Sequence, residues 1–348
     1  MKSKILYVGD LWYGSTALMR LEALRRIGHP VTGIDSSVNK LNRVSFFLMR
    51  VFNKFFRRLP DFIGVNKQIR VATRGQVFEI LWIDKGLSIS PKTLIDLKLI
   101  NDQLKLIHYS PDDMLNPQNQ TKYYLRSIPL FDLMVTTKSY NVAELSLLGA
   151  KQVFFSQNAY DPETHQPTEL DNAWMNQYGA SVGFIGGYEK DRADHIVHLV
   201  ENGIAVTVYG NGWISFINRY VNLRVVTGDF YGLDYVKIIC SIRINLSFLR
   251  KVNRDLQTQR SIEIPACGAF MLAERTQEHQ RLFVEGEEAD YFSSKLELVT
   301  KVNYYLSNPQ EVDRIRKNGL RRCVESDYSY DARMGEIVDY ADQQGKTL

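Results

Sequence analysis

The sequence predicts an α/β protein with two parallel sheets in tandem. Short apolar segments alternate with segments of helical apolar spacing, glycine follows several of the apolar segments, and the alternation breaks once near the middle of the chain. The first strand is expected at residues 4–8 and the first helix at 16–27. Because parallel strands need a crossover connection, this alternation favours sheets that are covered by helices on both faces.

The pattern continues on both sides of the break. Further strands are expected at residues 31–34, 77–83, 105–108, 133–136, 181–186, 205–209, 223–226, 242–248 and 269–273. The break contains Pro162, Pro167 and Gly179 and has little periodicity, which is typical of a linker. We therefore expect a first domain over 1–160, a linker over 161–180, a second domain over 181–328 and a final helix over 329–348.

Composition narrows the function classes. The chain has 348 residues with 43 basic and 39 acidic side chains, a balance too mild to predict a nucleic-acid partner. Cys240, Cys267 and Cys323 form no CxxC pair, which argues against disulfides and a cysteine-based zinc site. There is no apolar run of roughly 18 residues, and the first residues lack the pattern of a signal peptide. These features predict a cytoplasmic protein without a cysteine-based metal site, and we expect no other metal and no cofactor.

Two turns that contain glycine are candidate ligand sites. The first follows the first strand, where Gly14 and Ser15 could bring backbone N–H groups toward an anion. The alternative is that Ser15 only caps the next helix. The second turn is residues 184–192, with Gly187 and Tyr188 in the turn and Arg192 in the first turn of a helix. Its guanidinium could pair with a phosphate, or Arg192 could be an ordinary surface arginine.

Polar and charged residues cluster at residues 253–268, before an apolar helix-to-strand passage. If a helix begins near Ser261, then Arg260 and Glu263 lie on one helix face. An arginine beside a helix start stabilises a diphosphate, and a glutamate one turn further can accept hydrogen bonds from two ribose hydroxyls. The alternative is a solvent-exposed ion pair, worth about 0.2–0.5 kcal/mol.

These segments carry a resemblance to a known family. Residues 260–270 (RSIEIPACGAF), 186–192 (GGYEKDR) and 208–213 (VYGNGW) resemble the CgeB-like glycosyltransferases of the spore-maturation type. Residues 8–15, 132–141 and 158–167 resemble the same family in the same order. The resemblance implies the GT-B architecture: two Rossmann-like domains with parallel sheets facing a central cleft, the nucleotide sugar held mainly by the second domain, and a final helix that crosses back to the first.

The family is related to retaining enzymes with a Glu-x7-Glu pair, whose spacing falls here on Asp255 and Glu263. By this resemblance Glu263 binds the ribose, Asp255 stands beside the donor sugar, and Arg192 and Arg260 supply charge for the diphosphate. The residues expected at the donor are Gly14, Ser15, Gly187, Tyr188, Arg192, Tyr209, Gly210, Trp213, Arg260, Ser261 and Glu263, with Tyr209, Gly210 and Trp213 placed to contact the base.

An acid or an imidazole at a strand end could act as a base on an acceptor hydroxyl. His108 ends the strand expected at residues 105–108, and Asp112 and Asp113 come shortly after it. These three are the candidates, together with Asp255 among the catalytic residues. An inverting transfer would need such a base, whereas in a retaining transfer the departing phosphate can take the proton. The alternative is an ordinary Asp-rich turn after Pro111.

Residues 41–60 combine aromatic and basic side chains. The segment has five Lys or Arg residues, no acid and five phenylalanines, and Arg43, Arg50 and Arg57 recur every seven residues. A helix with this pattern could lie on anionic lipid, hold an acidic or lipid-linked acceptor, or pack its aromatic face on the sheet.

Taken together, the sequence predicts a cytoplasmic glycosyltransferase that moves a sugar from a nucleotide-diphosphate sugar, with UDP as the expected nucleotide, to a glycan, lipid-linked or protein acceptor with retention. Polysaccharide biosynthesis is the expected setting, with peripheral contact at the inner membrane surface through residues 41–60. Two alternatives remain: a non-catalytic glycan-binding or coat-assembly protein, and a nucleotide-sugar epimerase of the same fold.

Overall fold

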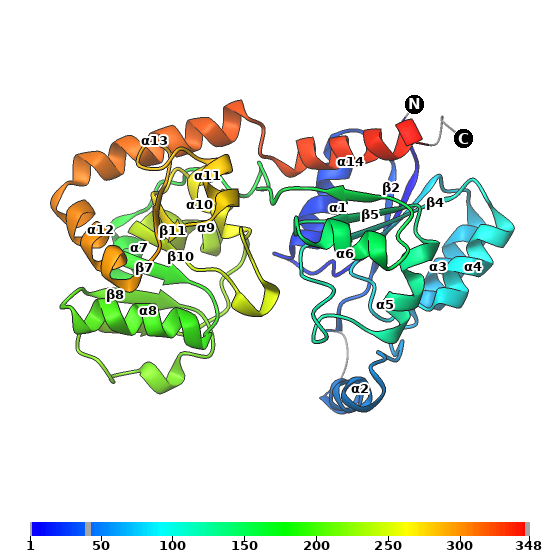
Figure 1. Ribbon diagram of the computed structural model, residues 1–348, viewed down its shortest axis with the longest axis horizontal. Helices are drawn as coiled ribbons and strands as arrows, with labels where there is room; N and C mark the ends of the chain where they lie inside the picture. Colours follow the sequence, from blue (N-terminus) through cyan, green and yellow to red (C-terminus); the bar gives the residue numbers. More distant parts are fainter. Residues whose placement is uncertain (1, 39–42, 345–348) are drawn as a thin grey trace. The chain divides into compact units, whose positions relative to one another are not determined.

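The computed structural model describes residues 2–38 and 43–344, except for the side chains of residues 43, 46, 50, 54 and 344. It divides into two compact units (Figure 1). Unit 1 consists of the chain up to Gln157 together with the segment from Tyr330, and unit 2 is Asn158–Ser329. Each unit contains a six-stranded sheet whose neighbouring strands are all parallel. The prediction of an α/β fold with two parallel sheets is therefore confirmed.

The sheet of unit 1 has the strand order β2-β1-β3-β4-β5-β6. Its strands are β1 (Ile5–Gly9), β2 (Val31–Asp35), β3 (Ile80–Asp84), β4 (Lys105–Ser110), β5 (Leu133–Thr136) and β6 (Val153–Phe155). Side chains alternate between the two faces along each strand. On one face Leu6 and Leu81 join a hydrophobic core, and on the other the rings of Tyr7, Trp82 and Tyr109 stack in a row.

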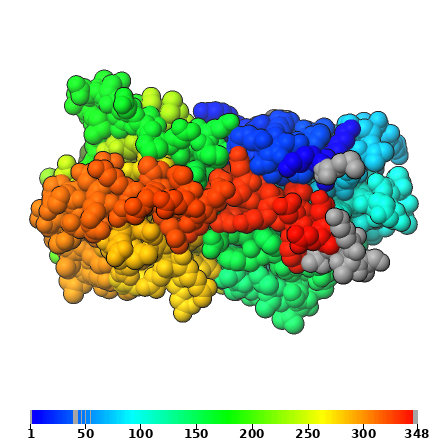
Figure 2. All heavy atoms as spheres, turned by 90° about the horizontal axis from the view of Figure 1, so that it is seen from above, coloured from blue at the N-terminus to red at the C-terminus, as the bar shows by residue number. Residues whose placement is uncertain are grey.

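The helices of unit 1 are α1 (Thr16–Arg26), α2 (Arg43–Phe56), α3 (Val65–Gly75), α4 (Pro91–Ile100), α5 (Lys122–Ser127), α6 (Asn141–Leu147) and α14 (Tyr330–Gln344). The last of them, α14, comes from the far end of the chain and packs against α1 (Figures 1 and 2). Arg26 forms an ion pair with Asp331 at 2.6 Å, and Lys105 forms one with Asp342 at 2.6 Å. These contacts fix the final helix to the first unit.

The sheet of unit 2 has the order β12-β11-β10-β7-β8-β9. Its strands are β7 (Ala180–Ile185), β8 (Val206–Tyr209), β9 (Leu223–Val226), β10 (Ile242–Ser247), β11 (Met271–Glu274) and β12 (Asp290–Phe292). The first strand of the unit, β7, thus lies between the second and the fourth. The strand order therefore reverses between β7 and β10, which is the arrangement of a Rossmann sheet.

The helices of unit 2 are α7 (Asn172–Tyr178), α8 (Lys190–Glu201), α9 (Gly232–Ser241), α10 (Arg260–Ala266), α11 (Gln277–Leu282), α12 (Lys295–Ser307) and α13 (Pro309–Glu325). Helices cover both faces of the sheet. Phe184 of β7 packs in a core with residues of α8 and α12, whereas its neighbour Ile185 packs in a second core with residues of α9 and α10. Residues 161–180, where the sequence predicted a linker, belong to unit 2, and α7 lies within them.

Candidate functional site

The reversal of strand order in unit 2 marks the expected ligand site. In open α/β sheets, ligands bind beyond the carboxyl ends of the strands at the point where the strand order reverses. Here that point lies beyond β7 and β10. The turn after β7 contains Gly186 and Gly187, and the segment after β10 runs through Asp255 to the start of α10 at Arg260.

The turn after β7 depends on two glycines. Gly186 has a φ of +155°, and a Cβ atom there would lie 2.8 Å from the ring of Phe184 and 3.4 Å from a guanidinium nitrogen of Arg260. A Cβ atom at Gly210 would lie 2.6 Å from the carbonyl oxygen of Gly186. Because neither position has a side chain, the ends of β7 and β8 meet closely and the Arg260 side chain reaches the backbone.

Tyr209 and Trp213 build this turn from inside. Both are fully buried. The Trp213 indole donates a hydrogen bond to the carbonyl oxygen of Gly186 at 3.0 Å, and the Tyr209 hydroxyl donates one to the carbonyl oxygen of Tyr178. Tyr188 differs, because 41% of it is exposed and its ring contacts Trp213 edge-on at 5.3 Å. Of the three aromatic residues predicted at the donor, Tyr188 is the one with an accessible face.

Two arginines converge at the end of β7. The guanidinium carbons of Arg192 and Arg260 each lie 5.5 Å from the centroid of the Phe184 ring. Arg192 donates to the carbonyl oxygen of Gly187 at 3.1 Å and lies 3.3 Å from Glu189. Its Nε and second terminal nitrogen, and the Nε of Arg260, are buried and have no hydrogen-bond partner among the described residues. Unsatisfied buried donors are rare and costly, so three at one place indicate a ligand with acceptor oxygens.

The charges around Arg192 also indicate an anionic ligand. Its pKa is lowered to about 10, first because it is buried and second because the Arg260 guanidinium is close. Glu189 and Asp255 oppose this effect, while Arg250 adds to it. Arg250 also forms an ion pair with Glu189 at 2.8 Å. The local balance of three arginines against two carboxylates leaves positive charge that an anion can neutralise.

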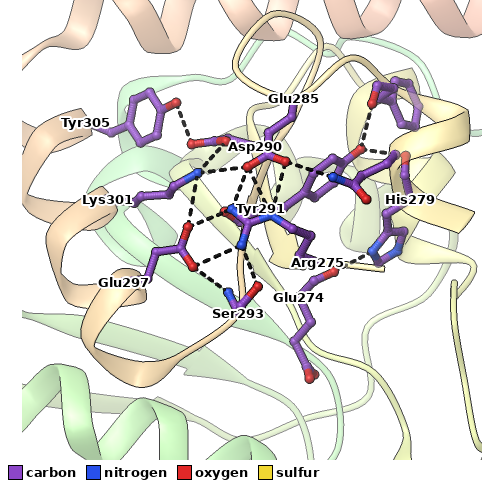
Figure 3. Close-up of polar contacts among 12 residues, drawn as sticks. Glu274, Arg275, His279, Glu285, Asp290, Tyr291, Ser293, Glu297, Lys301 and Tyr305 are labelled. Carbon is purple, nitrogen blue, oxygen red and sulfur yellow. Dashed lines mark hydrogen bonds and ion pairs between the residues drawn. The ribbon is translucent and has the colours of Figure 1, made fainter. Parts of the chain in front are cut away.

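The segment that carries Asp255 and Arg260 is fastened to β11 and α11. Leu249 donates its N–H to Glu274 at 2.8 Å, and Gln257 donates to Glu278 at 2.8 Å. Just beyond β11, Arg275 is held between Glu285 and Glu297 in an ion-pair cluster that also includes Lys301 and Asp290 (Figure 3). This cluster ties the ends of β11 and β12 to α12. The segment that carries Asp255 and Arg260 is therefore attached to a part of the sheet that ion pairs hold in place.

Ser261 helps to attach the start of α10 to α11. His279 donates from Nδ1 to the carbonyl oxygen of Glu274, so its Nε2 accepts a hydrogen bond from the Ser261 hydroxyl at 2.7 Å. Ser261 is fully buried, and its own N–H donates to Thr258. Its hydroxyl therefore positions the start of α10 rather than facing a ligand. The N–H groups of Ile262 and Glu263 also donate within this turn, to the carbonyl oxygen of Gln259, so an anion here would be held by arginine side chains.

Glu263 lies one turn further along α10. One carboxylate oxygen accepts a hydrogen bond from the Tyr235 hydroxyl at 2.6 Å, and the other lies 3.7 Å from Nε2 of His165. Nδ1 of His165 accepts a hydrogen bond from the N–H of Asp161, so its Nε2 carries the proton and faces the carboxylate. Burial and the adjacent Glu263 raise the pKa of Tyr235, so it remains a donor. The carboxylate of Glu263 is thus held in a fixed orientation.

In unit 1, the turn after β1 caps a helix. Ser15 accepts a hydrogen bond from the N–H of Leu18 at 3.1 Å, which makes it the N-cap of α1. Gly14 has a φ of +85°, which suits glycine in the turn. Ser15 therefore plays the capping role that was the alternative to ligand contact.

The three candidate bases of unit 1 lie in different surroundings. His108 is buried, its Nε2 donates to the carbonyl oxygen of Lys85, and burial lowers its pKa to about 4. Asp113 is buried and accepts hydrogen bonds from the N–H of Leu115 and from Asn141. Asp112 is partly exposed and forms an ion pair with Lys85 at 2.6 Å. Asp112 is thus the candidate with an accessible carboxylate.

Several site residues have no clear signature in the sequence. Glu189, Arg250 and Tyr235 join the site of unit 2, and Lys85 pairs with Asp112 in unit 1. Charged residues directly after predicted strands are the signal that could have found Lys85 and Arg250. Among residues 2–38 and 43–344, no group of three His, Cys, Asp or Glu side chains could hold a metal ion.

The chain is similar to known glycosyltransferases. Residues 192–339 match the family described as glycosyl transferase-like. The chain is similar to sucrose-phosphate synthase of Thermosynechococcus elongatus (12% identity, TM-score 0.70, all of both chains covered) and to Anabaena HepE in complex with UDP (10% identity, TM-score 0.63, 98% of this chain and 100% of that one). No curated protein sequence matches.

A structure assigned to a different activity is also similar to the chain. A Listeria monocytogenes structure assigned as a UDP-N-acetylglucosamine 2-epimerase has 9% identity and a TM-score of 0.57, with 100% of this chain and 98% of that one covered. These identities show the fold alone, which is that of the GT-B enzymes. The family match over residues 192–339 and the GT-B fold together support a glycosyltransferase, as the sequence predicted.

Proposed function

We propose that the chain transfers a sugar from a nucleoside-diphosphate sugar, bound by unit 2, to an acceptor hydroxyl. The observation that carries the proposal is the pair of Arg192, which is buried, and Arg260, which is partly buried, beyond the carboxyl end of β7. Three of their buried nitrogens, two of Arg192 and the Nε of Arg260, lack hydrogen-bond partners among the described residues. A diphosphate has the acceptor oxygens and the negative charge that this pair requires. We take UDP as the first nucleotide to test, because HepE was solved with UDP.

The remaining site residues receive roles by their position. Glu263 accepts hydrogen bonds from the ribose hydroxyls, since Tyr235 fixes its carboxylate while leaving lone pairs for a ligand. Tyr188 offers its exposed face to the base. Asp255 stands beside the donor sugar, as the Glu-x7-Glu spacing implies. The CgeB-like subtype remains part of this proposal.

The reaction breaks the bond between the anomeric carbon and the diphosphate oxygen and forms a bond from that carbon to the acceptor oxygen. In a retaining transfer the acceptor attacks on the side of the leaving group, and its proton passes to the departing phosphate. Arg192 and Arg260 stabilise the charge that grows on the diphosphate. We propose that the transfer retains the anomeric configuration. If the transfer were inverting instead, Asp112 of unit 1 would be the carboxylate that acts as the base.

We propose that the acceptor is a glycan, a lipid-linked saccharide or a protein. We also propose that the protein acts in the cytoplasm, in peripheral contact with the membrane. Among the described residues, no helix has the length and apolar character needed to cross a membrane.

A thermal-shift panel of nucleoside diphosphates tests the donor site, because a ligand that binds only the folded state raises the melting temperature. We expect UDP or another nucleoside diphosphate to raise it for the wild type and to lose this effect in Arg260→Ala and Glu263→Ala. Arg314→Ala, an exposed arginine of the same unit, is the matched control and should respond like the wild type. A panel with no response, or a response that both site variants keep, would refute the donor site.

Incubation with the sugar nucleotide then separates the activities. Release of free nucleoside diphosphate that depends on added acceptor supports transfer. Conversion of the sugar nucleotide to an isomer without acceptor would assign the site to an epimerase instead.

A further inference from the structure

Helix α2 presents an apolar face that is unpartnered among the described residues. Figure 1 shows α2 apart from the sheet and the other helices of unit 1. Six apolar residues share one side of the helix by their spacing and are all exposed: Val44, Phe47, Leu48, Phe52, Phe55 and Phe56. Val51, on the same side, is partly buried. Phe47 is 64% exposed and Phe55 is 72% exposed.

One edge of this apolar face is buried. Met49 is buried, and Ser45 and Asn53, one turn before and one turn after it, are partly buried. Their burial shows that α2 contacts the rest of the protein along this edge. Because Phe47, Phe52, Phe55 and Phe56 are exposed, the aromatic face does not pack on the sheet, which was one of the alternatives for residues 41–60.

Charge identifies what this face meets. From Ser36 to Pro60 the sequence has six basic residues, which are Lys40, Arg43, Arg50, Lys54, Arg57 and Arg58, and no acidic residue. Lys40 and the side chains of Arg43, Arg50 and Lys54 lie outside the described residues, while Arg57 is exposed beyond the end of the helix. Aromatic side chains next to several cations, without an acid, are the composition of helices that lie on anionic lipid.

A second copy of the chain fits this face less well. Two α2 helices in contact would bring two sets of cations together without a compensating carboxylate, which disfavours association. The helix has 14 residues and is about 21 Å long at 1.5 Å per residue, so it is too short to span a bilayer core of roughly 30 Å. It fits the plane of a membrane surface.

We infer that α2 docks unit 1 on an anionic lipid surface, with Phe47, Phe52 and Phe55 entering the interface and Arg57 and Arg58, directly after the helix, meeting lipid phosphates. This extends the proposed function by naming the surface where transfer takes place. It rests on contacts of unit 1 alone, so it does not depend on the donor site of unit 2.

Sedimentation of the full chain with vesicles tests the inference. We expect binding to phosphatidylcholine vesicles that contain 30% phosphatidylglycerol, about tenfold or more weaker binding to pure phosphatidylcholine, and weakening by salt. Phe47→Ser with Phe55→Ser should reduce binding at least tenfold, since each exposed ring loses its burial in lipid. Arg57→Gln with Arg58→Gln should reduce binding to the anionic vesicles by about fivefold for each charge.

The matched control is Leu99→Ser with Ile100→Ser, which removes two apolar side chains elsewhere on unit 1 that are at least as exposed as Phe47 and Phe55. It should bind vesicles like the wild type. The inference would be overturned if the Leu99→Ser, Ile100→Ser variant lost as much vesicle binding as the Phe47→Ser, Phe55→Ser variant. It would also be overturned if the wild-type chain did not bind vesicles and instead formed a dimer that Phe47→Ser with Phe55→Ser abolishes. The UDP-induced thermal shift should persist in the α2 variants, so failure of the lipid inference is separate from failure of the donor site.

Discussion

Arg192 and Arg260 lie over the same aromatic ring, each with its guanidinium carbon 5.5 Å from the centroid of Phe184. The ring attracts both cations, but the cations repel each other in a buried place, and this repulsion contributes to the lowered pKa of Arg192. The folded protein carries this cost while the site is empty of anion. Binding of a diphosphate removes the repulsion and satisfies the open N–H groups, so the same feature that costs stability favours the ligand.

This relationship predicts opposite effects on stability and on binding. Arg192→Met removes one of the two repelling cations, so the ligand-free melting temperature should stay the same or rise. Hydrogen bonds to charged groups contribute about 1.5–3 kcal/mol each, so affinity for UDP should fall by about tenfold to a hundredfold. Calorimetric titration and a thermal melt of the same sample measure both quantities. A variant that melts clearly lower while it binds UDP normally would show that Arg192 is only structural.

Gly186→Ala is predicted to disturb the same site through the backbone. The new Cβ atom would lie 2.8 Å from the ring of Phe184 in a backbone conformation that suits glycine. We expect a loss of about 1–3 kcal/mol in unfolding free energy, measured by denaturant titration, together with weaker UDP binding. Gly203→Ala is the matched control, because its φ of +82° is also positive but its Cβ atom meets nothing within 4 Å. An equal cost for both variants would mean that the contact with Phe184 is harmless.

The fold was predictable because its signal is local. Alternating apolar strands and amphipathic helices predict parallel sheets wherever they occur, and the helix expected within residues 41–60 is α2. Whether a side chain faces a ligand or the protein interior depends on contacts with distant parts of the chain, so local sequence does not predict it. Tyr209 and Trp213 stand at strand ends, where ligand contacts are frequent, yet both side chains turn inward to support Gly186. An aromatic residue at a strand end has the same signature in either role.

The proximity of Arg192 and Arg260 could not be predicted from the sequence either. Arg192 and Arg260 are both in motifs that the sequence singled out. Their approach over Phe184 depends on β7 and β10 being neighbours in the sheet, which no spacing in the sequence encodes. Likewise, the amphipathic pattern of α2 predicted a helix with an aromatic side, and only the structure shows that this side is exposed.

Acid sensitivity is predicted from two buried histidines, one in each unit. Burial lowers the pKa of His108 and of His279 to about 4, whereas the unfolded chain keeps a pKa near 6.5. The unfolded state therefore takes up protons first, and unfolding free energy should fall as the pH drops from 6.5 to 4.5, by about 2–3 kcal/mol for each histidine. Hydrogen bonds with Arg275 lower the pKa of Glu297 to about 2, so that residue contributes only at lower pH.

Denaturant titrations between pH 7 and 4.5 measure this effect. His279→Gln should remove its part of the pH dependence, because glutamine can still accept from Ser261 but does not ionise. An unchanged pH dependence in this variant would assign the acid sensitivity to other groups.

The buried ion pair beneath α14 is the last test. Asp84 accepts hydrogen bonds from Arg20 and from the Tyr7 hydroxyl, all at 2.8 Å, and Arg20 in turn donates to the Tyr330 hydroxyl at 3.3 Å. Asp84→Asn would leave the guanidinium of Arg20 buried without its counter-charge, so we expect a loss of about 3–5 kcal/mol in the unfolding free energy. Tyr330→Phe removes one hydrogen bond to a charged donor and should cost about 1–3 kcal/mol. Arg25→Ala, which breaks an exposed pair with Glu22, should cost less than about 1 kcal/mol. If Asp84→Asn costs no more than Arg25→Ala, the pair does not hold α14 on unit 1.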